Sequence, residues 1–198
     1  MKKEQVVNAV EIIKKGGVLI APTDSVYGLF GDALNEDTVN RIRGIKGRDG
    51  NKPFQIAVFK EDAGEYGILN ETALKIMGKY WPGDVNIIVE KRKKVPDNVS
   101  EKTVCMTCHR NQVIDSLVRG VGKPLVSTSV NLSGMPPATR VEEIDKEVAG
   151  KVDLIVDGGE TRHGIPNTII DTTKTPAEIV REGQIKKEEL ENLIKLKQ

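Results

Sequence analysis

Aromatic residues are scarce in this chain, and long apolar runs are absent. Phe, Trp and Tyr make up 4% of its 198 residues, which leaves little material for the stacked aromatic platform that binds single-stranded nucleic acid. No uninterrupted apolar run is longer than a few residues, so the sequence contains no candidate transmembrane helix. The amino terminus has no apolar segment of the kind found in signal peptides. We therefore expect a cytoplasmic protein that does not enter membranes.

A strong excess of one charge is also missing. The chain has 30 Lys and Arg against 29 Asp and Glu, which gives a net charge of +1. Such a balance does not predict strong binding to nucleic acid, although it leaves room for a local basic patch. The sequence also lacks GxGxxG and GxxxxGK(S/T). It therefore contains neither the Rossmann nor the P-loop motif for nucleotide binding.

The chain has only two cysteines, and they lie in an unusual context. Cys105, Cys108 and His109 spell CxxCH, which is the attachment sequence of a c-type haem. Alternatively, these residues could form half of a zinc site, for which His163 is the only other histidine available. Haem attachment requires export, and a CxxC redox motif requires a helix start that lowers the thiol pKa, whereas residues 103–107 alternate like a strand. We expect two free thiols, no haem and no zinc.

Hydrophobic periodicity predicts alternating helices and strands. Apolar residues at helical spacing, with caps or glycine breaks, predict helices over 4–15, 36–45, 70–80, 112–120, 142–149 and 187–196. Short apolar runs predict strands over 18–21, 54–59, 85–90, 103–107, 125–129, 153–156, 168–171 and 178–181. This alternation favours an α/β fold with a mixed sheet. The length suits one domain over residues 1–198, and two small domains are also compatible with it.

A cluster of cations follows the helix expected over 36–45. Lys46 and Arg48 flank Gly47, and in an extended loop their i, i+2 spacing points both side chains the same way. The compact ammonium charge of a lysine beside the planar guanidinium of an arginine, which donates several hydrogen bonds, suits a polyphosphate. We take Lys46 and Arg48 as candidate anion ligands, whereas Arg41 and Arg43 on the preceding helix are expected to face solvent.

A hydroxyl-rich segment, STSVNLSG at Ser127–Gly134, ends the strand that begins at Leu125. Small hydroxyl residues let a ligand approach the backbone closely, and Ser129 and Asn131 could bind phosphate oxygens or a ribose. The alternative is a turn whose hydroxyls are satisfied by the local backbone.

A third polar segment, PTDSVYGL at Pro22–Leu29, also follows an apolar strand. Thr23 and Tyr27 lie where crevices open at strand ends in α/β sheets, so Thr23 could bond a polar ligand and Tyr27 could wall a pocket. Asp24 is either a general base or the cap of a following helical turn. The glycine-rich loop over 158–168 could close over a ligand or simply connect two strands.

Together these segments resemble the YrdC/Sua5 family. Pro22–Leu29 matches its PTDTxYGL segment, Lys46 and Arg48 match its KxR motif, and Ser129 and Asn131 match its SxN motif. Further matches in the same order along the chain are Trp81–Gly83, Asp157–Gly159, Pro166–Asp171 and Arg181–Gly183. The resemblance covers nearly the whole chain and implies the short, single-domain form of the family, with a twisted mixed β-sheet flanked by helices.

The resemblance implies an ATP-dependent synthesis. Family members form threonylcarbamoyl-AMP and pyrophosphate from L-threonine, bicarbonate or CO2, and ATP. A partner transferase complex then passes the threonylcarbamoyl group to adenosine 37 of tRNA, giving the N6-threonylcarbamoyladenosine modification. ATP is thus implied as a substrate, and Mg²⁺ is expected to accompany it through its phosphates. The implied class is a nucleotidyltransferase.

The family motifs also imply a role for each matched residue. Lys46 and Arg48 would neutralise charge on the phosphates and carry the catalysis. The nucleotide would be oriented by Ser129 and Asn131, and no residue of the protein is expected to ligate a metal. The implied ATP-binding set is Lys46, Arg48, Ser129, Asn131 and Arg181, and the implied threonine or carbamate set is Thr23 and Tyr27.

The chain departs from the family pattern at four positions. Asp84 and Asn86 stand where the family usually reads WPGPxT, and Asn167 replaces the serine of PST. Thr107 replaces the arginine of VRxP, which removes a cation from the expected anion pocket, and Arg110 could replace it only from a different direction. The KxR and SxN motifs are intact, so nucleotide binding carries over more directly than amino-acid specificity and rate.

Three alternatives stay open. A carbamoyl-adenylate former, as in the YrdC-like domains of hydrogenase maturation proteins, would share the fold. An RNA-binding module would use a basic surface and bind RNA as its main ligand, whereas weak direct binding of tRNA is compatible with the synthase. A degenerate homologue would bind ATP but act on an altered substrate or on none. The sequence determines neither the oligomeric state nor the preference for threonine over serine.

Overall fold

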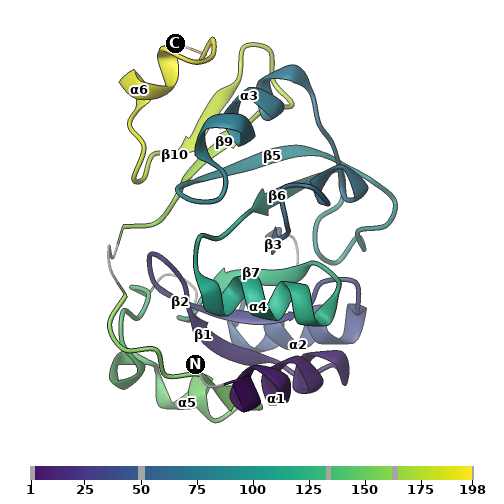
Figure 1. The fold of residues 1–198 in the computed structure, drawn as a ribbon, viewed down its shortest axis with the longest axis vertical. Coiled ribbons are helices and arrows are strands. Elements are labelled where there is room, and N and C mark those ends of the chain that lie inside the picture. Colours follow the sequence, from purple (N-terminus) through teal and green to yellow (C-terminus); the bar gives the residue numbers. More distant parts are fainter. Residues whose placement is uncertain (1–2, 49–51, 133–134, 162–164, 198) are drawn as a thin grey trace.

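The computed structural model of this protein describes residues 3–48, 52–132, 135–161 and 165–197. In this part of the chain, ten strands form one mixed sheet (Figure 1). The strands are β1 (Leu19–Pro22), β2 (Tyr27–Asp32), β3 (Gln55–Ala57), β4 (Gly67–Ile68), β5 (Val85–Lys91), β6 (Thr103–Thr107), β7 (Leu125–Ser129), β8 (Leu154–Ile155), β9 (Thr168–Asp171) and β10 (Glu178–Arg181). The expected mixed sheet is confirmed.

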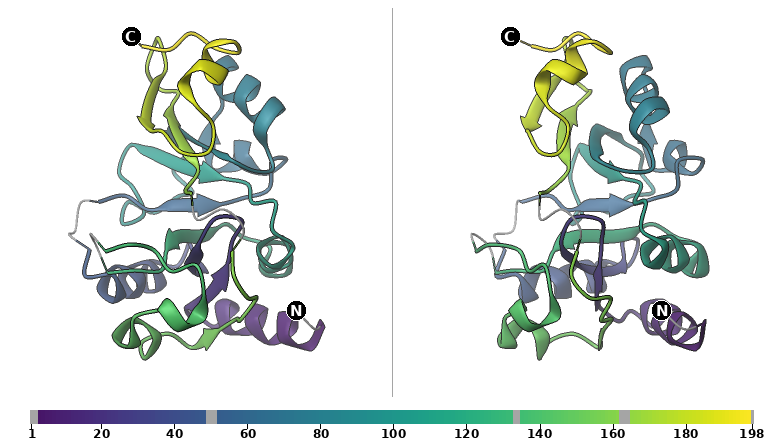
Figure 2. Two further views of the ribbon diagram at one scale, coloured as in Figure 1. Left: turned by 90° about the vertical axis from the view of Figure 1, so that its left-hand side faces the viewer. Right: turned by 60° about the vertical axis from the view of Figure 1, so that its left-hand side comes forward.

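Helices flank this sheet. The α-helices are α1 (Lys3–Lys14), α2 (Glu36–Ile45), α3 (Glu71–Tyr80), α4 (Gln112–Val121), α5 (Lys146–Ala149) and α6 (Lys187–Glu191), and two 3₁₀ helices are η1 (Ala63–Glu65) and η2 (Val141–Glu143). Figures 1 and 2 show α3 and α6 beside β5, β9 and β10 at one end of the molecule, with α1, α2 and α5 near β1 and β2 at the other. The expected α/β class is confirmed.

The strand order brings distant parts of the sequence together. Along the sheet it is β10-β9-β5-β6-β3-β7-β2-β1-β8, with β4 also pairing β5. The pairs β1–β8, β3–β6 and β5–β9 are parallel, and the others are antiparallel. The short strand β3 lies in the middle, between β6 and β7.

Alternate residues of the strands at the β1 end face two different layers of helices. On one face, α1 and α4 bury Ile13 and Leu117 against Leu19, Phe30 and Leu125 of the sheet. On the opposite face, α2 buries its apolar residues in the larger core. That core includes Val39, Ile42, Ile20, Leu29 and Val126. Successive side chains of a strand point to opposite faces of the sheet, so each strand contributes alternate residues to the two layers.

Asparagine side chains cap α2, α3 and α4 where the sequence predicts helices, through Asn35, Asn70 and Asn111. The Asn35 side-chain oxygen accepts hydrogen bonds from the amides of Asp37 and Thr38, both at 3.1 Å. The Asn70 side-chain oxygen accepts one from the amide of Ala73 at 2.8 Å. Each cap satisfies amides that the first turn of a helix leaves without partners.

Strand β2 was not expected from the sequence. Its six residues contain two glycines, which are unfavourable in strands, yet all six are buried. A Cβ on Gly31 would lie 2.5 Å from Cγ2 of Thr38 in α2. The glycine is therefore needed because α2 packs very close to the sheet at this point.

Two expected helices are shorter than the sequence suggests. The segment expected over 142–149 is divided into η2 and α5, because Ile144 is extended and Asp145 caps α5 through the amides of Glu147 and Val148. The last helix ends at Glu191 because the chain beyond it pairs with another segment. Leu196 forms a parallel bridge with Ala177. Residues 49–51, 133–134 and 162–164, which include His163 and the end of the hydroxyl-rich segment, lie outside the described residues.

Gly183 generates a prediction about stability. A Cβ at this position would lie 2.7 Å from the carbonyl carbon of Asn167 and 2.8 Å from the amide nitrogen of Thr168. Backbone atoms cannot move aside cheaply, so we expect Gly183→Ala to lower the free energy of unfolding by about 3 kcal/mol. Thermal unfolding should show a loss of roughly 6–12 °C in Tm.

Gly78 provides the matched control. It lies in α3, and a Cβ there would meet nothing within 4 Å. Gly78→Ala should raise the free energy of unfolding by about 0.5–1 kcal/mol, because alanine restricts the unfolded chain and favours a helix. Equal Tm values for the two variants would contradict the packing described at Gly183.

Candidate active site

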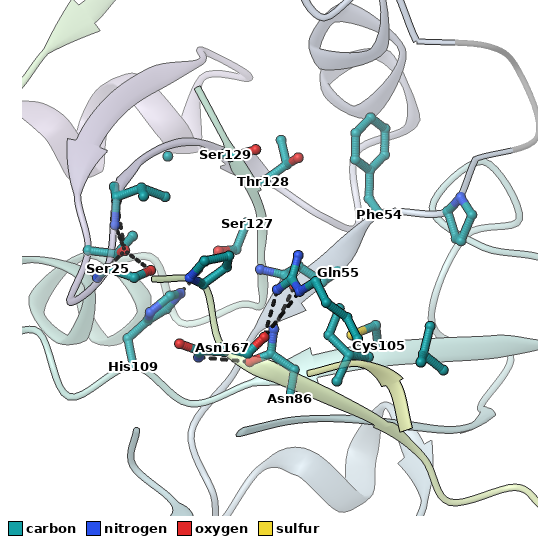
Figure 3. Close-up of a pocket in the computed structure, with 18 of the residues that line it drawn as sticks. Ser25, Phe54, Gln55, Asn86, Cys105, His109, Ser127, Thr128, Ser129 and Asn167 are labelled. Atoms are coloured by element: carbon teal, nitrogen blue, oxygen red, sulfur yellow. Dashed lines mark hydrogen bonds between the residues drawn. The ribbon is translucent and has the colours of Figure 1, made fainter. Parts of the chain in front are cut away.

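A cavity of about 410 Å³ lies over one face of the sheet (Figure 3). Four of the residues that line it are paired with one another across adjacent strands. Ile88 pairs with Cys105, Cys105 with Gln55, and Gln55 with Ser127. The pocket therefore crosses the middle of the sheet, whereas the sequence suggested a crevice at strand ends.

The position of the pocket follows from where the helices stop. Ala57 and Leu125 are buried in the layer that α1 and α4 cover. Gln55 lies two residues before Ala57, and Ser127 lies two residues after Leu125, so they point to the same face of the sheet. These two residues line the cavity. Polar side chains thus replace apolar ones where the helical layer ends.

Five of the seven predicted site residues line this cavity. They are Thr23, Tyr27, Arg48, Ser129 and Arg181. The other two, Lys46 and Asn131, lie behind Ser129 and bond to its segment. The structure therefore brings the three sequence motifs together at one site.

Lys46 is buried and holds the segment that follows β7. Only 4% of its surface is exposed. Its ammonium group donates hydrogen bonds to the carbonyl oxygen of Ser129 at 2.5 Å, and to the carbonyl and side-chain oxygens of Asn131 at 3.0 and 3.1 Å. The Ser129 hydroxyl donates to the same Asn131 side-chain oxygen at 2.6 Å. Lys46 therefore positions the serine that faces the pocket.

The chain around Lys46 is not the extended loop that the sequence suggested. The amides of Lys46, Gly47 and Arg48 donate to the carbonyl oxygens of Ile42, Gly44 and Arg43 respectively, so α2 ends in a Schellman motif at these residues. Gly47 has φ +54, which favours glycine. Both cations nevertheless reach the same segment, because Arg48 Nη1 lies 3.5 Å from the Thr128 hydroxyl.

Burial changes the acidity of Lys46. Desolvation, assisted by the positive charge of Arg48, lowers the pKa of its ammonium group to about 8. Three oxygen acceptors surround this group, and they favour its charged form. The charge that holds residues 129–131 is therefore complete at neutral pH and is lost as the pH rises above about 8.

Arg48 places its guanidinium group at the pocket wall. It donates to the carbonyl oxygen of Pro53 at 2.8 Å and lies 4.8 Å from the centroid of the Phe54 ring. Its Nε is buried and has no hydrogen-bond partner in the part of the chain that the structure describes.

The expectation that Arg41 and Arg43 face solvent was wrong for Arg43. Its guanidinium lies 4.7 Å from the same Phe54 ring and donates to the carbonyl oxygens of Lys52 and Asn98. It supports the segment before β3 without lining the pocket. Arg41 is partly exposed and forms an ion pair with Asp153 at 2.5 Å.

The hydroxyl groups of Thr23 and Tyr27 already have partners inside the protein. Thr23 Oγ1 donates to the carbonyl oxygen of Val26 at 2.7 Å and accepts from that residue's amide at 3.3 Å. Tyr27 donates to the carbonyl oxygen of Gly159 at 2.7 Å and accepts from the amide of Gly158 at 3.1 Å. Thr23 thus shapes the turn before β2, and Tyr27 ties the glycine loop to that strand.

A chain of amide groups forms another wall of the pocket, and the sequence did not point to it (Figure 3). The Asn86 amide nitrogen donates to the Gln55 side-chain oxygen at 2.8 Å, and that of Asn167 donates to the Asn86 side-chain oxygen at 3.0 Å. Arg181 donates twice to the Asn167 carbonyl oxygen, at 3.2 and 2.8 Å. Two of the four departures from the family pattern therefore touch each other here.

The cation lost at Thr107 is not restored by Arg110. Thr107 is fully buried, and its hydroxyl has no partner among the described residues. Arg110 is exposed, donates to the carbonyl oxygen of Pro82 and does not line the pocket. The cations that line the cavity are Arg48 and Arg181.

A histidine and a carboxylate lie together at the side of the pocket near β2. His109 Nε2 lies 3.0 Å from the Ser127 hydroxyl, and His109 Nδ1 lies 3.9 Å from Asp24 Oδ2. The suggested role of Asp24 as a helix cap was wrong, because the chain enters β2 rather than a helix. The CxxCH spacing drew attention to His109, but only as a metal or haem ligand.

The two thiols are free, as expected. Burial raises the pKa of the Cys108 thiol to about 11. Cys105 keeps some exposed surface at the pocket wall, yet desolvation by the surrounding protein raises its thiol pKa to about 12. Within the described ranges, no group of three or more His, Cys, Asp or Glu side chains could hold a metal ion. No helix there is long and apolar enough to cross a bilayer.

Known proteins share this fold and this sequence pattern. A relative from Methanocaldococcus jannaschii, named "Putative threonylcarbamoyl-AMP synthase", is 36% identical over 190 residues, which cover 93% of this chain and 90% of the relative. The structure of Pyrococcus abyssi Sua5 with L-threonine matches with a TM-score of 0.91 and 30% identity over all of this chain, which spans 60% of that protein. The structure of YciO from E. coli matches with a TM-score of 0.87 and 29% identity, covering 96% of this chain and 94% of YciO.

A family model covers most of the chain as well. The model for Sua5, YciO and YrdC proteins, which carries the description "Telomere recombination", matches residues 11–183. This span contains all seven site residues predicted from the sequence. The chain belongs to the Sua5/YciO/YrdC family.

Proposed function

We propose that this protein is an L-threonylcarbamoyladenylate synthase, a nucleotidyltransferase that makes threonylcarbamoyl-AMP for the modification of adenosine 37 in tRNA. The observation that carries the proposal is the buried ammonium of Lys46, which holds Ser129 and Asn131 beside Arg48 at one cavity. The name of the M. jannaschii relative and the threonine bound to P. abyssi Sua5 support it.

The pocket offers a cationic side for the phosphates of ATP. Arg48 supplies a fixed charge at the pocket wall, and Ser129 supplies a hydroxyl held in place through Asn131. Lys46 acts behind them, because its three hydrogen bonds keep residues 129–131 in one conformation. Arg181 adds a second cation at the amide wall. Preorganised charge of this kind stabilises phosphate charge that develops during transfer.

The reaction needs no covalent intermediate with the protein. The amine of L-threonine forms a carbamate with CO2 or bicarbonate. A carbamate oxygen then attacks the α-phosphorus of ATP, and the bond to the β-phosphate breaks to release pyrophosphate. Mg²⁺ would arrive with ATP and be held mainly by its phosphate oxygens. The protein contributes by positioning and by charge, with Thr23 and Tyr27 shaping the threonine end.

An altered substrate is the second candidate function. Thr107 and Asn86 make this pocket differ from the family pattern, and the E. coli YciO structure is similar to this protein over nearly the full length of both chains. A neutral amide wall would suit a substrate with less negative charge than a carboxylate. An RNA-binding role has no comparable support, because the cavity is lined by a single aromatic pair, Tyr27 and Phe54, that lies well inside the protein.

Pyrophosphate release tests the proposed activity directly. With ATP, Mg²⁺ and bicarbonate, we expect release that depends on L-threonine and is lower with serine or glycine. ATP binding without threonine-dependent release would contradict the synthase assignment and favour the altered substrate. Tight RNA binding that is independent of ATP and falls steeply with salt would favour the RNA-binding role.

Arg48 should be required for the use of ATP. Arg48→Ala removes a preorganised charge from the pocket wall, so we expect kcat/KM for ATP to fall by roughly 10²-fold or more. Lys46→Ala should have a similar effect, because it releases the segment that carries Ser129. Steady-state pyrophosphate release at several ATP concentrations measures both.

Arg43 offers the matched control for these variants. It packs on the same Phe54 ring as Arg48 but does not line the pocket. Arg43→Lys keeps the charge and should retain most of the activity. Turnover like that of the wild type in both Arg48→Ala and Lys46→Ala would remove the two cations from the active site.

The acidity of Lys46 predicts how ATP binding varies with pH. Because its pKa is lowered to about 8, the ammonium loses its proton as the pH rises through that value, and its bonds to residues 129–131 weaken. We expect the affinity for ATP, measured by titration calorimetry, to fall between about pH 7 and about pH 9.5. Lys46→Met should bind weakly across this range and lose that dependence. If the wild-type protein binds ATP with constant affinity over this pH range, the charge of Lys46 is not needed for ATP binding.

A further inference from the structure

Three side chains from separate segments form a proton path that leads into the pocket. The Ser127 hydroxyl lines the cavity and lies 3.0 Å from His109 Nε2. On the other side of the ring, His109 Nδ1 faces Asp24 Oδ2 at 3.9 Å. With a proton on Nδ1 toward the carboxylate, Nε2 is free to accept a proton from the serine.

The histidine is held in this orientation. The Phe30 ring packs edge-on against it, with centroids 6.2 Å apart. The amide of Arg110 donates to Asp24 Oδ2 at 3.0 Å and fixes the carboxylate. Burial opposes the ionisation of Asp24, but hydrogen bonding and charge from His109 and Arg110 hold the pKa of its carboxyl below the ordinary value.

This group lies apart from the cationic side of the pocket. Figure 3 shows His109 beside Ser25, Phe54 on the opposite side, and Ser127 between them. The other charged groups are placed differently. Arg48 and Arg181 line the cavity, whereas the guanidinium of Arg110 turns to the Pro82 carbonyl oxygen and lies 3.9 Å from Asp84. Asp24 is thus the carboxylate that faces the imidazole among the described residues.

We propose that His109, paired with Asp24, accepts through Ser127 the proton that the substrate ammonium must lose before it can react. This inference rests on the proposed function, in which the nucleophile is an α-amino group. A primary ammonium has no lone pair and cannot attack carbon until it is deprotonated.

The step balances in protons and electrons. The threonine ammonium gives a proton to Ser127 Oγ as the serine's own proton passes to His109 Nε2, which leaves a neutral amine and an imidazolium beside Asp24. The amine lone pair forms the N–C bond to CO2, and the second proton leaves to water, giving the carbamate. Its oxygen then displaces pyrophosphate from ATP. The imidazolium returns its proton to solvent after the product leaves.

His109→Gln tests the proposal, because glutamine keeps a polar side chain but cannot accept the proton. At about pH 7 we expect kcat for threonine-dependent pyrophosphate release to fall roughly 10²-fold, with the affinity for ATP unchanged. The deficit should shrink as the pH is raised, because the amine then loses its proton in solution before it binds. Ser127→Ala should show the same pattern, and Asp24→Asn a smaller loss in kcat.

Asp84→Asn is the matched control. Asp84 also lies near Arg110 but does not face His109. The pH profile of kcat for the Asp84→Asn enzyme should therefore match that of the wild type. A His109→Gln enzyme with the kcat and pH profile of the wild type, or with a deficit that is constant at every pH, would overturn the proposal while leaving the synthase function in place. A wild-type protein without threonine-dependent release at any pH would overturn both.

Discussion

A buried ammonium group at the end of α2 must find oxygen acceptors, and the arrangement of the pocket depends on this requirement. An unpaired charge in the interior costs several kcal/mol, so Lys46 is stable there only with the three oxygens of Ser129 and Asn131 around it. The same bonds tie the end of a helix to the end of the central strand β7. Binding a polyphosphate next to this cluster then needs little rearrangement, because the serine is already in place.

The rest of the pocket follows from what the helices leave uncovered. Where α1 and α4 cover the sheet, the facing residues are apolar, and where these helices stop, polar side chains occupy the same strand faces. Phe54, on whose ring Arg48 packs, lies on one side of this opening and His109 on the other, with Ser127 between them (Figure 3). In the proposed reaction, the phosphates of ATP and the amine of L-threonine would each lie beside side chains of suitable charge or basicity.

The local features of this protein could be predicted from its sequence, whereas the contacts between distant segments could not. The caps Asn35 and Asn70 and the motif residues around Lys46 are local patterns with a direct physical reason. Strand β2 was missed because its glycines are needed for a close approach that only the folded structure reveals. The amide wall joins Gln55, Asn86 and Asn167, which come together only through the strand order β9-β5-β6-β3. The proposed role of His109 could not be seen for the same reason, since this residue lies beyond the end of β6 and its partner Ser127 follows it by 18 residues in β7.

The most direct test of this account is a crystal structure with L-threonine and an ATP analogue whose bridge between the α- and β-phosphates cannot be cleaved. The account predicts phosphate oxygens at Arg48 and Ser129, the threonine nitrogen within hydrogen-bond distance of the Ser127 hydroxyl, and the 129–131 segment unchanged around Lys46. A nucleotide bound away from the cavity, or a threonine whose nitrogen points away from Ser127, would contradict it.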